Sequence, residues 1–277
     1  WFTQNPSIST YINDIFFTSR TTGWAITWNI NFPSFNTILL KSTDGGQSWF
    51  NQADLPDQAF FQSIFFHDSL SGWAGGKDGK IIFSTDGGDN WFPAITDSGL
   101  FSQFPIRDIQ FYNNNLGFAC GGSFDIAGVI WRTTDGGQLW TTGVVAPEPI
   151  QRLWFFDTQN ILGVGGDFEY GTGIVRSSNG GDSWDYTSLT SFGISAAVSF
   201  RTPREGWVSE GLARKFIISR DSGQTWLEHF TRDSLAVYDV VFTDTLHGFT
   251  GASDGIILRY NQFLLKYPAL TSPSNGY

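Results

Sequence analysis

The sequence predicts an all-β chain folded as a six-bladed β-propeller of four-stranded antiparallel blades. Three observations predict this fold: a turn motif that recurs five times, six paired apolar strands, and a composition typical of strands and turns. The chain has 277 residues, among them 32 Gly, 27 Phe and 12 Trp, and aromatic residues favour strands whereas Gly favours turns. A seven-bladed propeller is the alternative.

The turn motif is an octet that reads Ser/Thr-x-Asp-x-Gly-x-x-Trp. Its acidic positions (Asp44, Asp86, Asp135, Asn179 and Asp221) are separated by 42, 49, 44 and 42 residues, a period typical of repeat architectures. We expect the acidic side chain to accept hydrogen bonds from backbone N–H groups one and two residues further on, and the Gly to adopt a positive φ. The predicted turn residues are Asp44, Gly46, Trp49, Asp86, Gly88, Trp91, Asp135, Gly137, Trp140, Asn179, Gly181, Trp184, Asp221, Gly223 and Trp226.

Strand patterns surround each octet. Apolar pairs at period two mark one strand in each of six units, at Ile15/Phe17, Ile64/Phe66, Ile109/Phe111, Leu153/Phe155, Val198/Phe200 and Val240/Phe242. Six residues after the Phe comes a Gly that begins the second strand, except in the fourth unit, which has Ile161 there. A short aliphatic run gives the third strand and the octet Trp opens the fourth, so each unit is predicted to be one propeller blade.

The last unit has no octet, and we expect residues 1–7 to supply its fourth strand. Trp1-Phe2-Thr3-Gln4 repeats Trp49-Phe50-Asn51-Gln52 in three of four positions, and closing the ring in this way leaves no open blade edge. A strand at 263–267 is the rival. The predicted domains are a propeller at 1–262 and a C-terminal extension or linker at 263–277, which could lead to a further module.

Composition excludes several functions. The net charge of −10 argues against nucleic acid, which binds clustered Lys and Arg. The three His are scattered and the one Cys, Cys120, has no partner motif, so we expect no cofactor, no metal and no catalytic thiol. No membrane-spanning segment is predicted. Because the chain lacks Met, we expect that an upstream signal has been removed and that the protein is exported, to the cell surface, periplasm or extracellular space.

A binding site is expected on the face opposite the octets, where the loops vary. In a blade, the loop between the second and third strands and the connection to the next blade lie on that face, and loops on a rigid scaffold carry function. Aromatic and charged side chains there suit a protein partner or, second, a sugar chain; packing between blades is the alternative role for the rings. The candidate residues are Trp28, Phe32, Phe35, Lys77, Asp78, Phe124, Asp125, Phe168, Glu169, Tyr170 and Arg214.

The octet resembles the Asp-box (BNR repeat) of sialidases and related β-propellers, in which the box is a structural turn. The resemblance raises glycoside hydrolysis, which in sialidases needs three Arg side chains, a Tyr/Glu nucleophile pair and an acid Asp. The chain contains the residue types, among them Arg107, Arg152, Arg201, Arg204, Tyr170 and Glu169, but no Arg recurs at a fixed inner-strand position. We therefore expect no catalytic residues.

A second resemblance covers about residues 1–260. Ser71-Gly72-Trp73-Ala74-Gly75-Gly76, followed by Asp86-Gly87-Gly88 and Trp91, resembles the unit of the photosystem II stability/assembly factor-like propellers, which are described as non-enzymatic scaffolds. The resemblance implies a secreted scaffold that binds another protein through its variable loops. The alternatives are a glycan-binding or sialidase-like protein and a structural subunit of an extracellular assembly.

Overall fold

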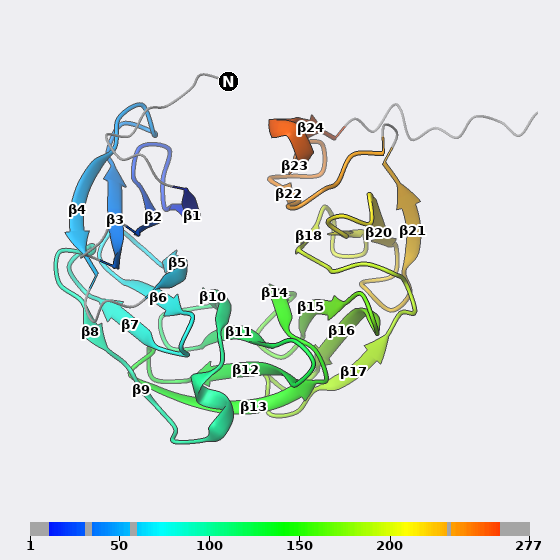
Figure 1. Ribbon diagram of the computed structural model, residues 1–277, viewed down its shortest axis with the longest axis horizontal. Coiled ribbons are helices and arrows are strands. Elements are labelled where there is room, and N and C mark those ends of the chain that lie inside the picture. The colour runs from blue at the N-terminus through cyan, green and yellow to red at the C-terminus, as the bar shows by residue number, and fades with distance from the viewer. Residues whose placement is uncertain (1–10, 31–34, 56–59, 232–233, 261–277) are drawn as a thin grey trace, which may run out of the picture. The chain divides into compact units, whose positions relative to one another are not determined.

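The computed structural model describes residues 11–30, 35–55, 60–231 and 234–260, and these residues form six small, mainly antiparallel sheets (Figure 1). These sheets are the blades of a six-bladed β-propeller, as predicted. By its internal contacts the chain divides into two compact units, one ending at Ala196 and one beginning at Ala197. No described helix is both long and apolar enough to cross a membrane.

The first unit contains four blades. Blade 1 is formed by β1 (Ile12–Phe17), β2 (Gly23–Asn29), β3 (Asn36–Ser42) and β4 (Phe50–Asp54). Blade 2 is formed by β5 (Phe61–Phe66), β6 (Gly72–Gly76), β7 (Ile81–Ser84) and β8 (Phe92–Pro93). Blade 3 is formed by β10 (Ile106–Phe111), β11 (Gly117–Ser123), β12 (Ala127–Thr133) and β13 (Leu139–Ala146). Blade 4 is formed by β14 (Ile150–Phe155), β15 (Ile161–Asp167), β16 (Gly171–Ser177) and β17 (Asp185–Ser188).

The second unit contains two blades. Blade 5 is formed by β18 (Ala197–Phe200), β19 (Gly206–Ser209), β20 (Lys215–Ser219) and β21 (Leu227–Phe230). Blade 6 has three described strands, β22 (Val241–Phe242), β23 (Gly248–Gly251) and β24 (Ile257–Arg259). Both candidates for its fourth strand, residues 1–7 and 263–267, lie outside the described residues.

Blade 3 departs from the predicted four strands. The short strand β9 (Ile95–Thr96), which follows blade 2 in the sequence, pairs in parallel with β13. A 3-10 turn, η2 (Leu100–Gln103), then leads into β10, and a second one, η3 (Ser253–Gly255), joins β23 to β24. The two-residue strand β9 extends the blade 3 sheet outward, an addition that alternation of apolar residues could not reveal.

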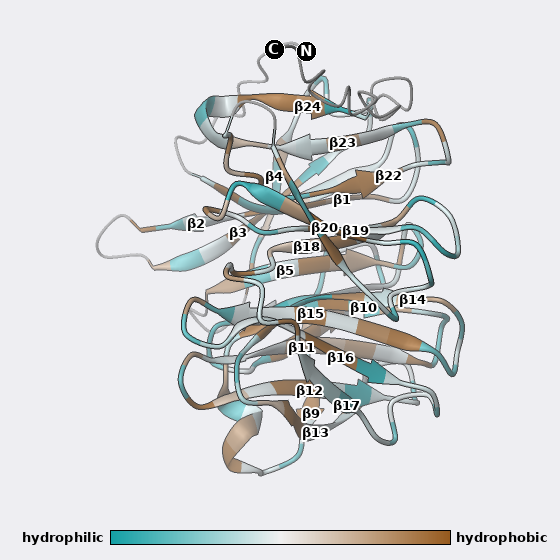
Figure 2. Cartoon of the chain, turned by 90° about the vertical axis from the view of Figure 1, so that its right-hand side faces the viewer, coloured by the Kyte–Doolittle hydropathy of each residue, from teal (hydrophilic) through white to brown (hydrophobic). Residues whose placement is uncertain are grey.

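Large rings join neighbouring blades in the first unit. The Trp that follows the first Gly of the second strand in one blade stacks on the Phe that ends the first strand of the next. The ring centroids of Trp24 and Phe66 are 3.8 Å apart, as are those of Trp73 and Phe111. Trp24 Nε1 also donates to the carbonyl oxygen of Gly87 in the next blade's octet, at 3.0 Å. Burial of such rings drives the blades together. Figure 2 shows hydrophobic stretches along many strands, with hydrophilic residues in loops and on parts of other strands.

The same Phe explains the Gly that begins the second strand. A Cβ added at Gly72 would lie 2.4 Å from the ring of Phe66, too close for any side chain. In blade 4 the ring of Phe155 lies against Phe118 and Tyr112, and Ile161 occupies the Gly position. Phe155 thus keeps the ring contact with the preceding blade although Ile161 stands in place of the Gly.

Candidate functional site

The octets form hydrogen-bonded turns, as predicted, although the donors to the acidic residue differ from those expected. In blade 1, Asp44 Oδ1 accepts from the backbone N–H of Ser48, four residues further on, at 2.9 Å. Ser42 Oγ accepts from the N–H of Gly46 at 2.8 Å. The expected donors one and two residues after the Asp are therefore wrong, because the side chain spans the whole loop. Equivalent bonds to the acidic position come from Asn90, Leu139, Ser183 and Thr225.

Each octet is also tied to the turn between the first two strands of its own blade. The N–H that follows the acidic residue donates to a carbonyl there, as from Gly45 to Thr21 at 2.9 Å. That donor adopts a positive φ, for which Gly is suited; in blade 5 it is Ser222, with φ 62°. Trp140 is fully buried, whereas Trp49, Trp91, Trp184 and Trp226 are half-buried. The octets are thus structural turns without reactive geometry.

The turn carboxylates make the free energy of unfolding depend on pH in the acid range. Hydrogen bonds from the side chain and backbone of the residue four further on hold the pKa of Asp44, Asp86 and Asp221 at about 2. Since the folded pKa lies below the ordinary value of 3.8, their stabilisation is present above pH 4 and is lost as the pH falls through 2. Asn is the residue that blade 4 has at position 179. Replacing all three Asp residues by Asn is expected to reduce the decrease in the free energy of unfolding as the pH falls. Urea unfolding between pH 2 and 5 measures it, and an equal acid loss in the triple variant would contradict this origin.

The inner strands of the first unit carry polar groups that link one blade to the next. Asp14 accepts from the N–H of Ile64 at 2.8 Å, Ser63 from that of Ile109 at 3.2 Å, and Asp108 from that of Leu153 at 3.2 Å. The three acceptors occupy the same position of β1, β5 and β10. Burial raises the pKa of Asp14 to about 6. These inter-blade bonds were missed from the sequence, because their partners lie 45 to 50 residues apart.

The Arg residues weighed for glycoside hydrolysis have structural partners. Arg152 pairs with the buried Asp108 at 3.2 Å. The guanidinium of Arg107 lies over the ring of Phe124, 5.0 Å from its centroid. Arg201 pairs with Glu205 in the second unit. None of these contacts presents a three-Arg clamp beside the Tyr170 and Glu169 of the blade 4 turn.

The candidate residues of blades 1 and 2 divide between packing and exposure. Trp28 is half-buried, contacts Phe60 and donates to the carbonyl of Phe61. Lys77 Nζ lies 4.2 Å from the centroid of the Trp28 ring. Asp78 pairs with Lys80 at 3.3 Å. Phe35 is exposed, and Phe32 lies outside the described residues. Among the Phe residues near the connections between blades, Phe61 is buried in a core of unit 1, and Phe101 and Phe104 are partly buried against the next core.

The candidate residues of blades 3 and 4 lie together. Phe124 and Asp125 form the β11–β12 turn, and Phe168, Glu169 and Tyr170 form the β15–β16 turn, where all five are exposed. The ring of Phe168 is 5.2 Å from that of Phe192, in the segment after blade 4, and the two side chains are 39% and 61% exposed. Arg214 is exposed in the β19–β20 turn of the second unit.

Three carboxylates meet between these turns. The carboxylate oxygens of Asp125, Glu148 and Asp167 all lie within 4.8 Å of one another. Glu148 accepts from the N–H of Asp125, and Asp167 accepts from those of Glu169 and Tyr170. Burial, opposed in part by the Asp125 N–H, raises the pKa of Glu148, and the nearby acidic groups add to the increase. Such oxygens suit a hard cation or a cationic side chain. Glu148 was missed, since a single Glu between two Pro residues carries no pattern.

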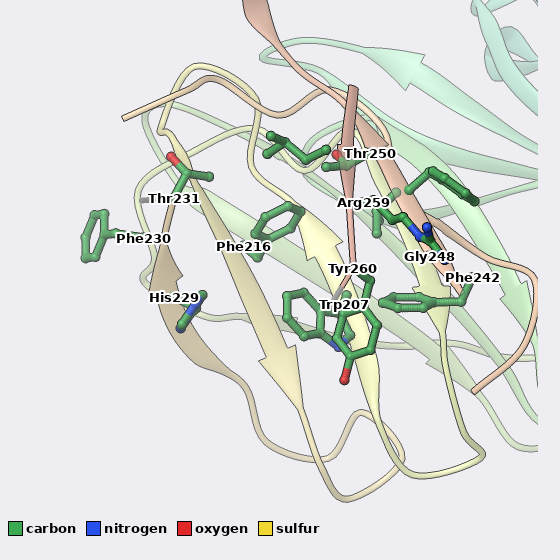
Figure 3. A pocket seen from close by; sticks show the side chains of 13 residues that line it. Trp207, Phe216, His229, Phe230, Thr231, Phe242, Gly248, Thr250, Arg259 and Tyr260 are labelled. Carbon is green, nitrogen blue, oxygen red and sulfur yellow. The ribbon is translucent and has the colours of Figure 1, made fainter. Parts of the chain in front are cut away.

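An apolar pocket lies within the second unit, between the sheets of blades 5 and 6 (Figure 3). The rings of Trp207, Phe216, Phe242 and Tyr260 face it, with His229 at its side. In blade 5 the half-buried octet residue Trp226 contacts Phe200, whereas in blade 6 Tyr260 contacts the equivalent residue, Phe242, at 5.3 Å. Tyr260 thus supplies a ring contact where this blade has no octet Trp. None of the candidate binding residues that the structure describes lines the pocket.

Comparison with known families decides the relationship. Residues 1–193 match the sequence profile of the family described as Photosynthesis system II assembly factor YCF48. The chain belongs to this family. Membership confirms the resemblance drawn from the octets, and it agrees with the prediction that the chain is not an enzyme, because the relatives are assembly factors.

Curated relatives match this YCF48-family chain over only part of its length. The Photosystem II assembly lipoprotein Ycf48 of Synechococcus sp. (strain CC9902) is 30% identical over 111 residues, which are 39% of this chain and 32% of that protein. The Ycf48 of Synechocystis is 41% identical over 66 residues, 23% of this chain and 19% of that protein. The matched segments thus span a third or less of these relatives.

Solved structures show the same fold. YCF48 bound to D1 peptide has a TM-score of 0.57 at 21% identity, covering 95% of this chain and 96% of that one. YCF48 from Cyanidioschyzon merolae has a TM-score of 0.63 at 16% identity, covering 92% and 97%. The GH74 xyloglucanase from Xanthomonas campestris has a TM-score of 0.66 at 14% identity, covering 90% and 44%. At these identities the likeness shows the fold and carries no activity.

Proposed function

We propose that the chain is a non-enzymatic scaffold in an exported compartment that binds a segment of another protein through the loops opposite the octet turns. The exposed contact of Phe168 with Phe192 carries the proposal, because two large rings that shield each other only in part are typical of a binding surface. Tyr170 and Phe124 extend this apolar surface on the neighbouring turns. Membership of an assembly-factor family supports the role.

The relatives support two further parts of the proposal. One solved family member is YCF48 bound to a peptide, which agrees with a partner that is a short protein segment. The curated relatives are lipoproteins, and lipoproteins are exported. We do not expect the octet turns, whose polar groups bond within the loop, to bind the partner. They therefore serve as the comparison surface in the experiment.

A selection with a displayed library of random 12-residue peptides tests the proposed face. The double variant Phe168→Ser/Phe192→Ser is expected to bind the selected peptides at least about tenfold more weakly, the loss of roughly one buried ring contact. The matched control is Phe50→Ser/Phe92→Ser, which removes two exposed Phe residues directly after octets. Weaker binding in the control, with full binding in the Phe168/Phe192 variant, would place the site elsewhere and defeat the proposal.

A further inference from the structure

The surface over blades 3 and 4 combines exposed rings with negative charge. Its apolar part is formed by Phe124, Phe168, Tyr170 and Phe192, which are all exposed. Its polar part is the group of three carboxylates Asp125, Glu148 and Asp167. We call these seven residues the blade 3–4 surface. The β11–β12 turn contributes Phe124 and Asp125, and the β15 end and its turn contribute Asp167, Phe168 and Tyr170, so rings and carboxylates are adjacent in the sequence as well as in space.

The negative charge of this surface is not neutralised by an ion pair among the described residues. The ion pairs of blades 3 and 4 involve other acids, Asp108 with Arg152 and Asp182 with Arg132, and the guanidinium of Arg107 lies over the ring of Phe124. Glu148 and Asp167 are 2% and 7% exposed, and the hydrogen bonds that they accept come from neutral backbone N–H groups. Charges held so close in a partly dehydrated place repel one another. A cation from a partner would relieve that repulsion.

We infer that the partner segment carries a Lys or Arg side chain that binds Asp125, Glu148 and Asp167, next to an apolar side chain that packs on Phe168, Tyr170 and Phe192. This inference rests on the proposed function and names the chemistry of its partner. Charge complementarity selects the cation: the three carboxylates supply its acceptors, and the whole chain is acidic, at −10. The rings supply the apolar contact that holds a Lys stem or a neighbouring aromatic side chain.

Defined synthetic peptides test the inference. Three 12-residue peptides carry at their centre a Lys-Phe pair, a Glu-Phe pair or a Lys-Ser pair in an otherwise identical Gly/Ser sequence, and fluorescence anisotropy measures their affinity. We expect the Lys-Phe peptide to bind at least about tenfold more tightly than either of the others. The double variant Glu148→Gln/Asp167→Asn should remove the preference for Lys over Glu, while keeping the acceptors that hold the loops.

Two matched variants complete the design. Asp182→Asn/Asp185→Asn changes the net charge equally, at exposed positions in and directly after the blade 4 octet, and should keep the preference. Asp125→Asn changes an exposed position with φ 61°, a conformation that Asn tolerates. It should reduce the preference for Lys while leaving the buried residues unchanged. This variant therefore tests the inference even if the double variant fails to fold. A preference for Lys that survives in both Asp125→Asn and Glu148→Gln/Asp167→Asn would overturn the inference.

The outcomes separate this inference from the proposed function. If the Phe168→Ser/Phe192→Ser variant loses its selected peptides but no Lys preference exists, the function stands and the charge inference fails. If the Phe variant keeps its peptides, the proposed face itself is wrong. A rise in melting temperature with 1 mM Ca²⁺ that disappears in Asp125→Asn would identify a metal ion as the occupant of the carboxylates and would also overturn the inference.

Discussion

Replacing Trp140 by Ala is expected to lower the free energy of unfolding by about 3–5 kcal/mol, the usual loss for a fully buried Trp. Trp140 is 0% exposed, its ring lies 5.6 Å from that of Phe111, and its Nε1 donates to the carbonyl of Gly137. The truncation leaves a cavity in the blade 2–3 core, which surrounding rings can fill only in part.

Trp91→Ala is the matched control for this prediction. Trp91 occupies the same octet position, donates to Gly88 in the same way and lies 6.0 Å from Phe66, but it is half-buried. Its loss should therefore be clearly smaller. Chemical denaturation followed by Trp fluorescence and far-UV circular dichroism compares the two, and equal losses would show that the burial of Trp140 is not what stabilises the turn.

Replacing Asp108 by Ala is expected to lower the free energy of unfolding by about 2–4 kcal/mol. Asp108 is buried and accepts hydrogen bonds from the Leu153 N–H, Gln110 and Arg152. The change leaves a buried N–H without its acceptor between blades 3 and 4 and removes the partner of the Arg152 charge. The expected loss in free energy of unfolding is smaller than for a fully buried ion pair, because Arg152 is partly exposed to solvent.

Two other replacements establish the origin of that loss. Asp108→Asn keeps an oxygen for the Leu153 N–H and should cost less than the Ala variant. Asp182→Ala breaks the exposed pair with Arg132 and should cost less than about 1 kcal/mol. Urea unfolding at pH 7 measures all three. An Asp108→Ala loss no larger than that of Asp182→Ala would contradict the role of Asp108 in joining the blades.

The repeat allowed most of the fold to be predicted. The octet combines an acceptor, a Gly and a Trp that are all needed by one loop, so a few letters determine a turn, and their period determines the blades. The pairing of Gly72 with Phe66 likewise depends on nearby residues. Contacts between blades depend on residues about 45 positions apart, so Asp14, Ser63 and Asp108 looked like isolated polar residues in apolar strands.

The candidate site was predicted less completely for the same reason. The topology of a blade placed the loops of blades 3 and 4 on one face, which led to Phe124, Asp125, Phe168 and Tyr170. Glu148 and Phe192 come from connections whose path the sequence does not encode locally, and they complete the carboxylate group and the ring pair. An aromatic ring in a loop could either pack within the protein or bind a partner. At Trp28 the sequence did not distinguish the two roles, because the ring's contacts come from the neighbouring blade.

The most direct test of the scaffold role is site-specific photo-crosslinking in the organism that produces the protein. A photoreactive amino acid in place of Phe168 is compared with the same residue in place of Phe92, and mass spectrometry identifies the proteins captured. We expect a specific partner from position 168 that also loses co-purification with the Phe168→Ser/Phe192→Ser variant. Capture of that partner from position 92, with nothing from position 168, would contradict the account.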